Sequence, residues 1–225
     1  MKKLFGCFLC MMLLVFGVVP SAWTDSFTLQ GVNYPSQIRA SVDFDYTSIS
    51  ETAGTIDIDI TNTSSITSSL TAFAFNVPDV VTGASLTGTV PTGWSALFNK
   101  DGINTPGQYG FFDLAGITKT DFNGGKVAYG IPAPPDTTFS FTFSLIGTNL
   151  NLLDENSFLS LLSAPPEHGQ PDPQYFIARF QGIGGESEGG SDVAIPNPVP
   201  EPTTMLLLGS GLVGLAGFGR KKFKK

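Results

Sequence analysis

Strict alternation of apolar and polar residues restricts the fold of this chain more than any other feature. Every second residue from Phe139 to Leu145 is large and apolar, and the same period recurs at Ser41–Tyr46, Thr55–Ile60 and Leu70–Val77. This period is typical of β-strands with one buried and one exposed face. Weaker segments of the same kind predict further strands at residues 26–32, 93–99, 108–114, 126–130 and 174–181.

Turn-forming residues separate these segments, for example at Asp101-Gly102 and Asn123-Gly124-Gly125. Short alternating strands between such turns predict an all-β fold, an antiparallel β-sandwich of jelly-roll or Ig-like type with one face of each sheet buried. One short helix is expected within residues 152–162. The folded body is expected to span residues 25–195, with the glycine-rich stretch 182–190 as a flexible loop.

Residues 1–24 have the layout of a secretory signal peptide. Two lysines precede an apolar run from Leu4 to Val19, and Pro20 ends the run before a stretch with small residues. We expect cleavage after Thr24, with the bond after Ala22 as second choice. The alternative is an N-terminal membrane anchor, which the short length of the run disfavours.

Few residues of the chain are suited to nucleophilic or metal chemistry. Both cysteines, Cys7 and Cys10, lie within the signal peptide, so the mature chain has no disulfide and no thiol. His168 is the only histidine, and a histidine-based zinc site is therefore excluded by count. No catalytic residue and no obligatory cofactor is predicted.

The other end of the chain has a second membrane-directed segment. Residues 196–202 form a proline-rich linker. Residues 203–219 form an uncharged apolar run, which we predict to be a transmembrane segment at the short end of the usual length. A basic cluster closes the chain: Arg220, Lys221, Lys222, Lys224 and Lys225. Such a cluster stays on the cytoplasmic side, so the acidic body would lie across the membrane.

The order of these features resembles a known family of sorting signals. The triplet Pro200-Glu201-Pro202, then a glycine-broken apolar run and a terminal basic cluster, resembles the PEP-CTERM protein-sorting signal. The resemblance is limited to the C-terminal tail together with the signal peptide. It implies export through the Sec machinery, a transient stay in the inner membrane of a Gram-negative bacterium, and cutting at the triplet by an exosortase, a membrane-embedded thiol protease or transpeptidase. The processed protein would then reach the cell surface or the medium.

The charge of the body excludes one class of partner. The chain has 12 Lys and Arg against 19 Asp and Glu, and most of the basic residues lie in the two ends. The body is therefore strongly acidic, which excludes nucleic acid as a partner.

Four aspartates form the first candidate site. Asp43 and Asp45 share one face of a predicted strand, and Asp57 and Asp59 share one face of the next. If residues 47–54 close a hairpin, an even register sets carboxylate against carboxylate. We interpret these acids first as solvated surface charge; the alternatives are a Ca²⁺ site and a pair of glycosidase carboxylates.

Three aromatic residues form the second candidate site. Trp94 is the sole tryptophan of the body, and Tyr109 and Tyr129 are expected to be exposed. Exposed aromatics on a β-sandwich suggest glycan binding, although a single tryptophan is more often part of a core. The leading interpretation is a non-enzymatic surface or matrix protein associated with exopolysaccharide or biofilm. The alternatives are a carbohydrate-binding module and, less favoured, a glycoside-active enzyme.

Overall fold

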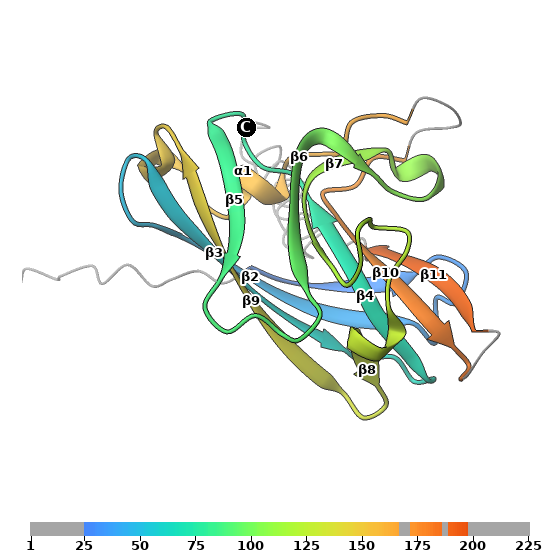
Figure 1. Ribbon diagram of the computed structural model, residues 1–225. Coiled ribbons are helices and arrows are strands. Elements are labelled where there is room, and N and C mark those ends of the chain that lie inside the picture. The colour runs from blue at the N-terminus through green and yellow to red at the C-terminus, as the bar shows by residue number, and fades with distance from the viewer. Residues whose placement is uncertain (1–24, 167–171, 186–188, 198–225) are drawn as a thin grey trace, which may run out of the picture.

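The computed structural model describes residues 25–166, 172–185 and 189–197, which form a β-rich body (Figure 1). The strands are β1 (Asp25–Gly31), β2 (Arg39–Ser48), β3 (Ala53–Asn62), β4 (Ser68–Phe75), β5 (Val81–Thr87), β6 (Ser95–Asn104), β7 (Phe111–Ile117), β8 (Ile131–Ala133), β9 (Thr137–Gly147), β10 (Phe176–Ile183) and β11 (Gly190–Pro196). The helices are the 3-10 turns η1 (Gly107–Tyr109), η2 (Val127–Tyr129) and η3 (Leu150–Leu152) and the short α1 (Asn156–Leu159).

All strands belong to one antiparallel sheet. Its order is β5-β9-β3-β2-β1-β11-β10-β4-β7-β6, with β8 pairing separately to β4. The sheet curls until its two edge strands, β5 and β6, contact each other, and Figure 1 shows them side by side. The predicted all-β antiparallel fold with one short helix is confirmed, and both layers of the sandwich come from a single nearly closed sheet.

Aromatic residues fill the space inside the sheet. The alternation in β2, β3 and β9 turns every second side chain inward, so that residues such as Phe44, Ile58 and Phe143 are fully buried. Phe73 and Phe75 of β4 stack on Phe176 of β10 at centroid distances of 5.8 and 5.9 Å. Apolar burial on this scale is the main favourable term in folding.

A second, smaller core lies on the opposite face of β4. Every residue of β4 is buried, which contradicts the expectation that only one face of each sheet is covered. The large residues of β4 point inward, and the small Ala72 and Ala74 allow Phe112 of β7 and Phe122 of the following loop to pack closely on the outer face. The outer face of β1, β2, β3 and β9 remains polar.

Three strands of the structure were not predicted from the sequence, and one predicted strand was wrong. Residues 126–130 form η2 rather than a strand. β5, β8 and β11 were not predicted, and β11 is central in the sheet, between β1 and β10. The inward positions of β11 include Asp192 and Ala194, so the strand lacks the large alternating residues that mark the others.

Across the described ranges, no helix has both the length and the apolar character needed to cross a membrane. The predicted signal peptide and the predicted span at residues 203–219 lie outside these ranges.

Candidate functional site

The structure brings the four predicted aspartates together on the outer face of the β2–β3 hairpin. Asp43 lies opposite Asp59, and Asp45 lies opposite Asp57. The even register considered from the sequence is confirmed. Asp43, Asp57 and Asp59 are exposed and Asp45 is half-buried.

Hydroxyl side chains surround these carboxylates. Ser26 Oγ of β1 donates a hydrogen bond to Asp43, and Thr142 Oγ1 of β9 donates one to Asp57. Thr61 and Thr138 share a hydrogen bond of 2.6 Å between their hydroxyl oxygens. We name this surface the hydroxyl–carboxylate face; it comprises Ser26, Thr28, Ser41, Asp43, Asp45, Thr47, Thr55, Asp57, Asp59, Thr61, Thr138, Ser140, Thr142 and Ser144.

This face can bind water, hydroxyl groups and loosely held cations. Within the described ranges, no group of three or more His, Cys, Asp or Glu side chains is placed to hold a metal ion. Two opposed carboxylates offer fewer oxygens than the six to eight that Ca²⁺ usually takes. The Ca²⁺ site at Asp43, Asp45, Asp57 and Asp59 stays a prediction.

Trp94 is part of the core, which corrects its predicted role as an exposed glycan platform. Its side chain is 6% exposed and packs on Phe73 and Phe141 at centroid distances of 5.8 and 4.7 Å. The indole Nε1 donates a hydrogen bond of 2.7 Å to the carbonyl oxygen of Tyr129. The phenyl rings of Phe73 and Phe141 hold the indole in place, and its only polar atom already has a hydrogen-bond acceptor within the body.

The two predicted tyrosines differ from each other. Tyr109 is 6% exposed and lies in the second core, so its expected exposure was wrong. Burial raises the pKa of Tyr109, and the negative charges of Asp172 and Asp192 raise it further. Tyr129 is 38% exposed, with Lys126 Nζ 5.6 Å from the centre of its ring. Of the three predicted aromatics, Tyr129 alone has a surface that a glycan can reach.

The sequence analysis missed a buried carboxylate at Asp192. This side chain is 1% exposed and accepts hydrogen bonds from the backbone amides of Asn33, Tyr34 and Val193, the shortest at 2.8 Å. The side-chain amide of Asn33 donates a further bond of 2.9 Å. Asp192 thereby fastens the turn after β1 to β11. The signal in the sequence was a lone acid at an inward position of Ser191–Ile195, a segment for which no strand was predicted.

A polar pocket of about 360 Å³ lies beside Asp192. Its wall includes Asn33, Gln108, Tyr109 and Arg179. Arg179 Nη2 donates a hydrogen bond of 2.9 Å to Ser191 Oγ, and its buried Nε has no partner among the described residues. Desolvation lowers the pKa of Arg179, and the charge of Asp192 opposes that shift.

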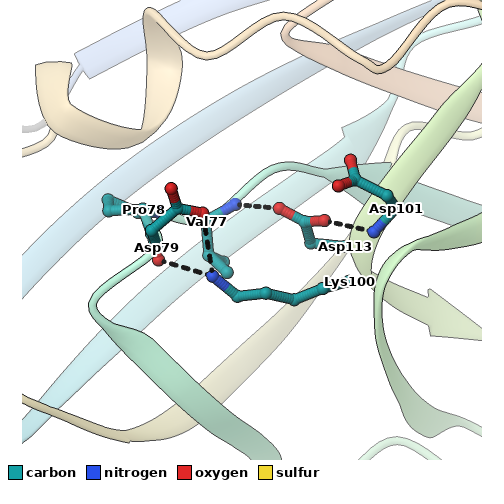
Figure 2. A network of polar contacts seen from close by, with 6 residues as sticks. All are labelled: Val77, Pro78, Asp79, Lys100, Asp101 and Asp113. Carbon is teal, nitrogen blue, oxygen red and sulfur yellow. Dashed lines mark hydrogen bonds and ion pairs between the residues drawn. The ribbon is translucent and has the colours of Figure 1, made fainter.

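A second buried carboxylate, Asp113, has a structural role (Figure 2). Asp113 Oδ1 accepts a 2.7 Å hydrogen bond from the amide of Asp101, and Oδ2 accepts a 3.1 Å bond from the amide of Val77. Lys100 Nζ donates to the carbonyl of Pro78 at 3.1 Å and pairs with Asp79 at 3.5 Å. These contacts join the end of β4 to β6 and β7. Both oxygens of Asp113 are occupied by backbone amides, so this carboxylate holds the loops rather than a ligand.

The two ends of the body leave it from neighbouring strands. β1 pairs with β11 through Leu29 and Pro196, and the amide of Asn197 donates a 2.9 Å hydrogen bond to the carbonyl of Thr28. The remaining predicted site residues lie outside the described ranges: Thr24, Pro200, Glu201, Pro202, Arg220, Lys221, Lys222, Lys224 and Lys225. His168 lies outside them as well.

Comparison with known proteins identifies the tail. No curated protein and no solved structure matches the chain. Residues 198–221 match the family model of the PEP-CTERM protein-sorting motif, directly after the last described residue of the body. The chain therefore carries a PEP-CTERM sorting signal at its C-terminal end, which marks it as an exported protein that an exosortase sorts.

Proposed function

We propose that this chain is a non-enzymatic protein of the cell surface or extracellular matrix of a Gram-negative bacterium. An exosortase would cut it at or beside Pro200-Glu201-Pro202 and free the body from the inner membrane. The observation that carries this proposal is the sorting motif at residues 198–221, which begins directly after Asn197, the last described residue of the body.

The charges of the tail support the order of events. Translocation through the Sec machinery would stop at the five terminal cations, because moving charged groups through hydrocarbon is costly. The apolar run 203–219 would then hold the precursor in the inner membrane. Between Asn197 and this run lie five residues, which span at most about 18 Å when fully extended. The triplet is therefore close both to the body and to the membrane.

The hydroxyl–carboxylate face supports a role for the body in a hydrated matrix. It presents hydroxyl and carboxylate oxygens on a rigid sheet, and such groups exchange hydrogen bonds with water and with the hydroxyl groups of an exopolysaccharide. The carbohydrate-binding module in the same location remains the alternative, with Tyr129 as its exposed aromatic.

Intact-mass measurement tests the sorting step. In a strain with exosortase, surface material should end near Val199 and lack Arg220–Lys225, and in a strain without the enzyme the tail should persist. Pro202→Ala should reduce cleavage, whereas Pro196→Ala, at the end of β11, serves as the matched control outside the triplet. Recovery of the full tail from the surface of the exosortase-positive strain would overturn the proposal.

Retention on the polysaccharide of the producing strain tests the role of the body. Tyr129 and Tyr34 are exposed to nearly the same extent, 38% and 37%, which makes Tyr34→Ala a matched control for Tyr129→Ala. A matrix role of the hydroxyl–carboxylate face predicts equal retention of both variants. Loss of retention in Tyr129→Ala alone would favour the carbohydrate-binding module.

A further inference from the structure

One edge of β1 is paired over part of its length. On one side β1 pairs with β2 from Asp25 to Gln30. On the other side it pairs with β11 from Leu29 to Gly31. One more hydrogen bond follows, from the amide of Asn197 to Thr28, and in the part of the chain that the structure describes no strand pairs with Asp25–Phe27 on this edge.

The free backbone groups on this edge can be assigned from the register. Backbone groups of alternate residues point to the same side of a strand, so Ser26 faces the same edge as Thr28. On the opposite strand the amide of Asn197 faces β1. If the strand continued, the next amide with that direction would belong to Val199. A continued ladder would therefore pair Val199 with Ser26.

The prolines at the end of β11 and after it fit this continuation. They occupy positions 196, 198, 200 and 202, and each alternates with a residue that keeps its amide. Proline cannot donate to a ladder, so it is tolerated where the missing amide would point away from the neighbouring strand. If the ladder continued in the register set by Asn197, Pro198 and Pro200 would both fall at such positions.

On the inner face of the sheet, apolar side chains lie beside this edge of β1. Pro196 is buried beside Leu29. In a continued strand the next inward position would be residue 198. Its neighbour on β1 would be Phe27, a half-buried ring that packs edge-on against Tyr175 and Phe176 at 5.4 and 5.2 Å.

We propose that the edge of β1 at Asp25–Phe27 is the docking site for residues 198–200 of this same chain, which extend β11 with Val199 paired to Ser26. This is strand addition within one molecule, in which backbone hydrogen bonds hold the added segment and a side-chain pocket fixes its register. Pro200 then lies opposite Asp25, the first residue after the predicted signal cleavage. The pairing ends there, and Glu201-Pro202 leaves the sheet. That Glu201-Pro202 lies outside the sheet, where an exosortase can reach it, matters for processing only if the proposed function holds. The pairing of residues 198–200 with β1 does not depend on that function.

Disulfide trapping tests the register directly. The signal-processed chain, purified with its tail from an exosortase-deficient strain, has no cysteine of its own. Directly opposed residues have Cα atoms about 4.5–5.5 Å apart, within the range that a disulfide spans. With oxidised glutathione, Ser26→Cys/Val199→Cys should crosslink at least about tenfold faster than the out-of-register pair Ser26→Cys/Glu201→Cys, as expected for a segment held in one register. Equal rates for the two pairs would overturn the docking.

Hydrogen exchange of the Ser26 amide provides a second, independent test. Val199→Pro removes the one amide of residues 198–200 that would face β1, and Pro198→Ala adds an amide that faces away. Exchange at Ser26 should accelerate roughly tenfold in Val199→Pro and stay close to the unsubstituted rate in Pro198→Ala. The same rate in the unsubstituted chain and in Val199→Pro would overturn the proposal. Neither measurement involves an exosortase, so their failure leaves the sorting function intact, and a failure of sorting leaves the pairing intact.

Discussion

Asp43 lies directly opposite Asp59 across the β2–β3 ladder, with both carboxylates on the exposed face of the sheet. Asp45 and Asp57 repeat the arrangement two residues further along. Like charges directly opposite each other on a sheet are unfavourable, and this repulsion is screened by salt. The polar half of the sheet therefore carries like charges that face each other, and the hydroxyls of Ser26 and Thr142 donate hydrogen bonds to two of these carboxylates.

The first prediction concerns that repulsion. Asp59→Asn should raise the free energy of unfolding at low ionic strength by roughly 0.2–1 kcal/mol, because it removes one charge of an opposed pair. The gain should disappear at about 1 M salt, where the screening length is about 3 Å. Urea unfolding at both salt concentrations measures the difference. Asp121→Asn, an exposed acid outside this face, is the control; a gain that persists in high salt would exclude the electrostatic cause.

Calcium separates the two interpretations of the same face. Because two opposed carboxylates offer few ligands, we expect the same melting temperature in Ca²⁺ and in chelator when the ionic strength is fixed. An ion that binds the folded state would stabilise it by mass action. A melting temperature that rises in Ca²⁺ and no longer does so in Asp57→Asn would establish the predicted Ca²⁺ site instead.

Trp94 provides a prediction about the core. Trp94→Ala should cost about 3–5 kcal/mol of unfolding free energy, since it removes a large buried ring from between Phe73 and Phe141. Trp94→Phe keeps part of the packing and should cost less, although it leaves the carbonyl of Tyr129 without its donor. Urea unfolding followed by far-UV circular dichroism measures all three chains in the same way, because the two substituted chains lack the indole fluorescence of Trp94. An unfolding midpoint unchanged in Trp94→Ala would show that the ring is outside the core.

The contrast between the hairpin and Trp94 shows what the sequence can and cannot predict. The local alternation of apolar and polar residues predicts the two strands of the β2–β3 hairpin, and an even register between them sets the aspartates opposite each other. The burial of Trp94 depends on Phe73 and Phe141, which are distant in sequence, and no local pattern encodes their meeting. β11 was missed because an acid and a small residue occupy its inward positions, and the partners that satisfy Asp192 come from the other end of the body.

Asp192 itself carries the next prediction. Asp192→Asn replaces one carboxylate oxygen by an amide that cannot accept from the backbone of Asn33 and Tyr34. Leaving buried donors without partners should cost about 2–4 kcal/mol, measured by urea unfolding. Hydrogen exchange in the turn at residues 32–37 should accelerate in the same variant. Ser191→Ala, on the exposed side of β11, is the matched control, and an equal cost in both would contradict a specific role of the carboxylate.

The last prediction concerns alkaline pH. Burial raises the pKa of Tyr46 above its ordinary value, while a hydrogen bond with Ser48 opposes the shift. The buried hydroxyl donates a 2.6 Å hydrogen bond to the carbonyl of Leu150, and an ionised phenol could not make it. A raised pKa in the folded state means that the unfolded chain loses its proton first. The resulting stability is complete below pH about 10 and is lost as the pH rises through the pKa of the folded protein.

Tyr46→Phe isolates this contribution. At pH 7 the variant should be less stable by about 1 kcal/mol, because the carbonyl of Leu150 loses its donor. Above pH 10 its unfolding free energy should fall less steeply than that of the unsubstituted chain, because the phenylalanine ring cannot ionise. Part of the decline should remain, since burial raises the pKa of Tyr109 and Tyr175 in the same direction. Chemical unfolding from pH 7 to 11 gives both curves; parallel curves throughout that range would show that the ionisation of Tyr46 is not linked to folding.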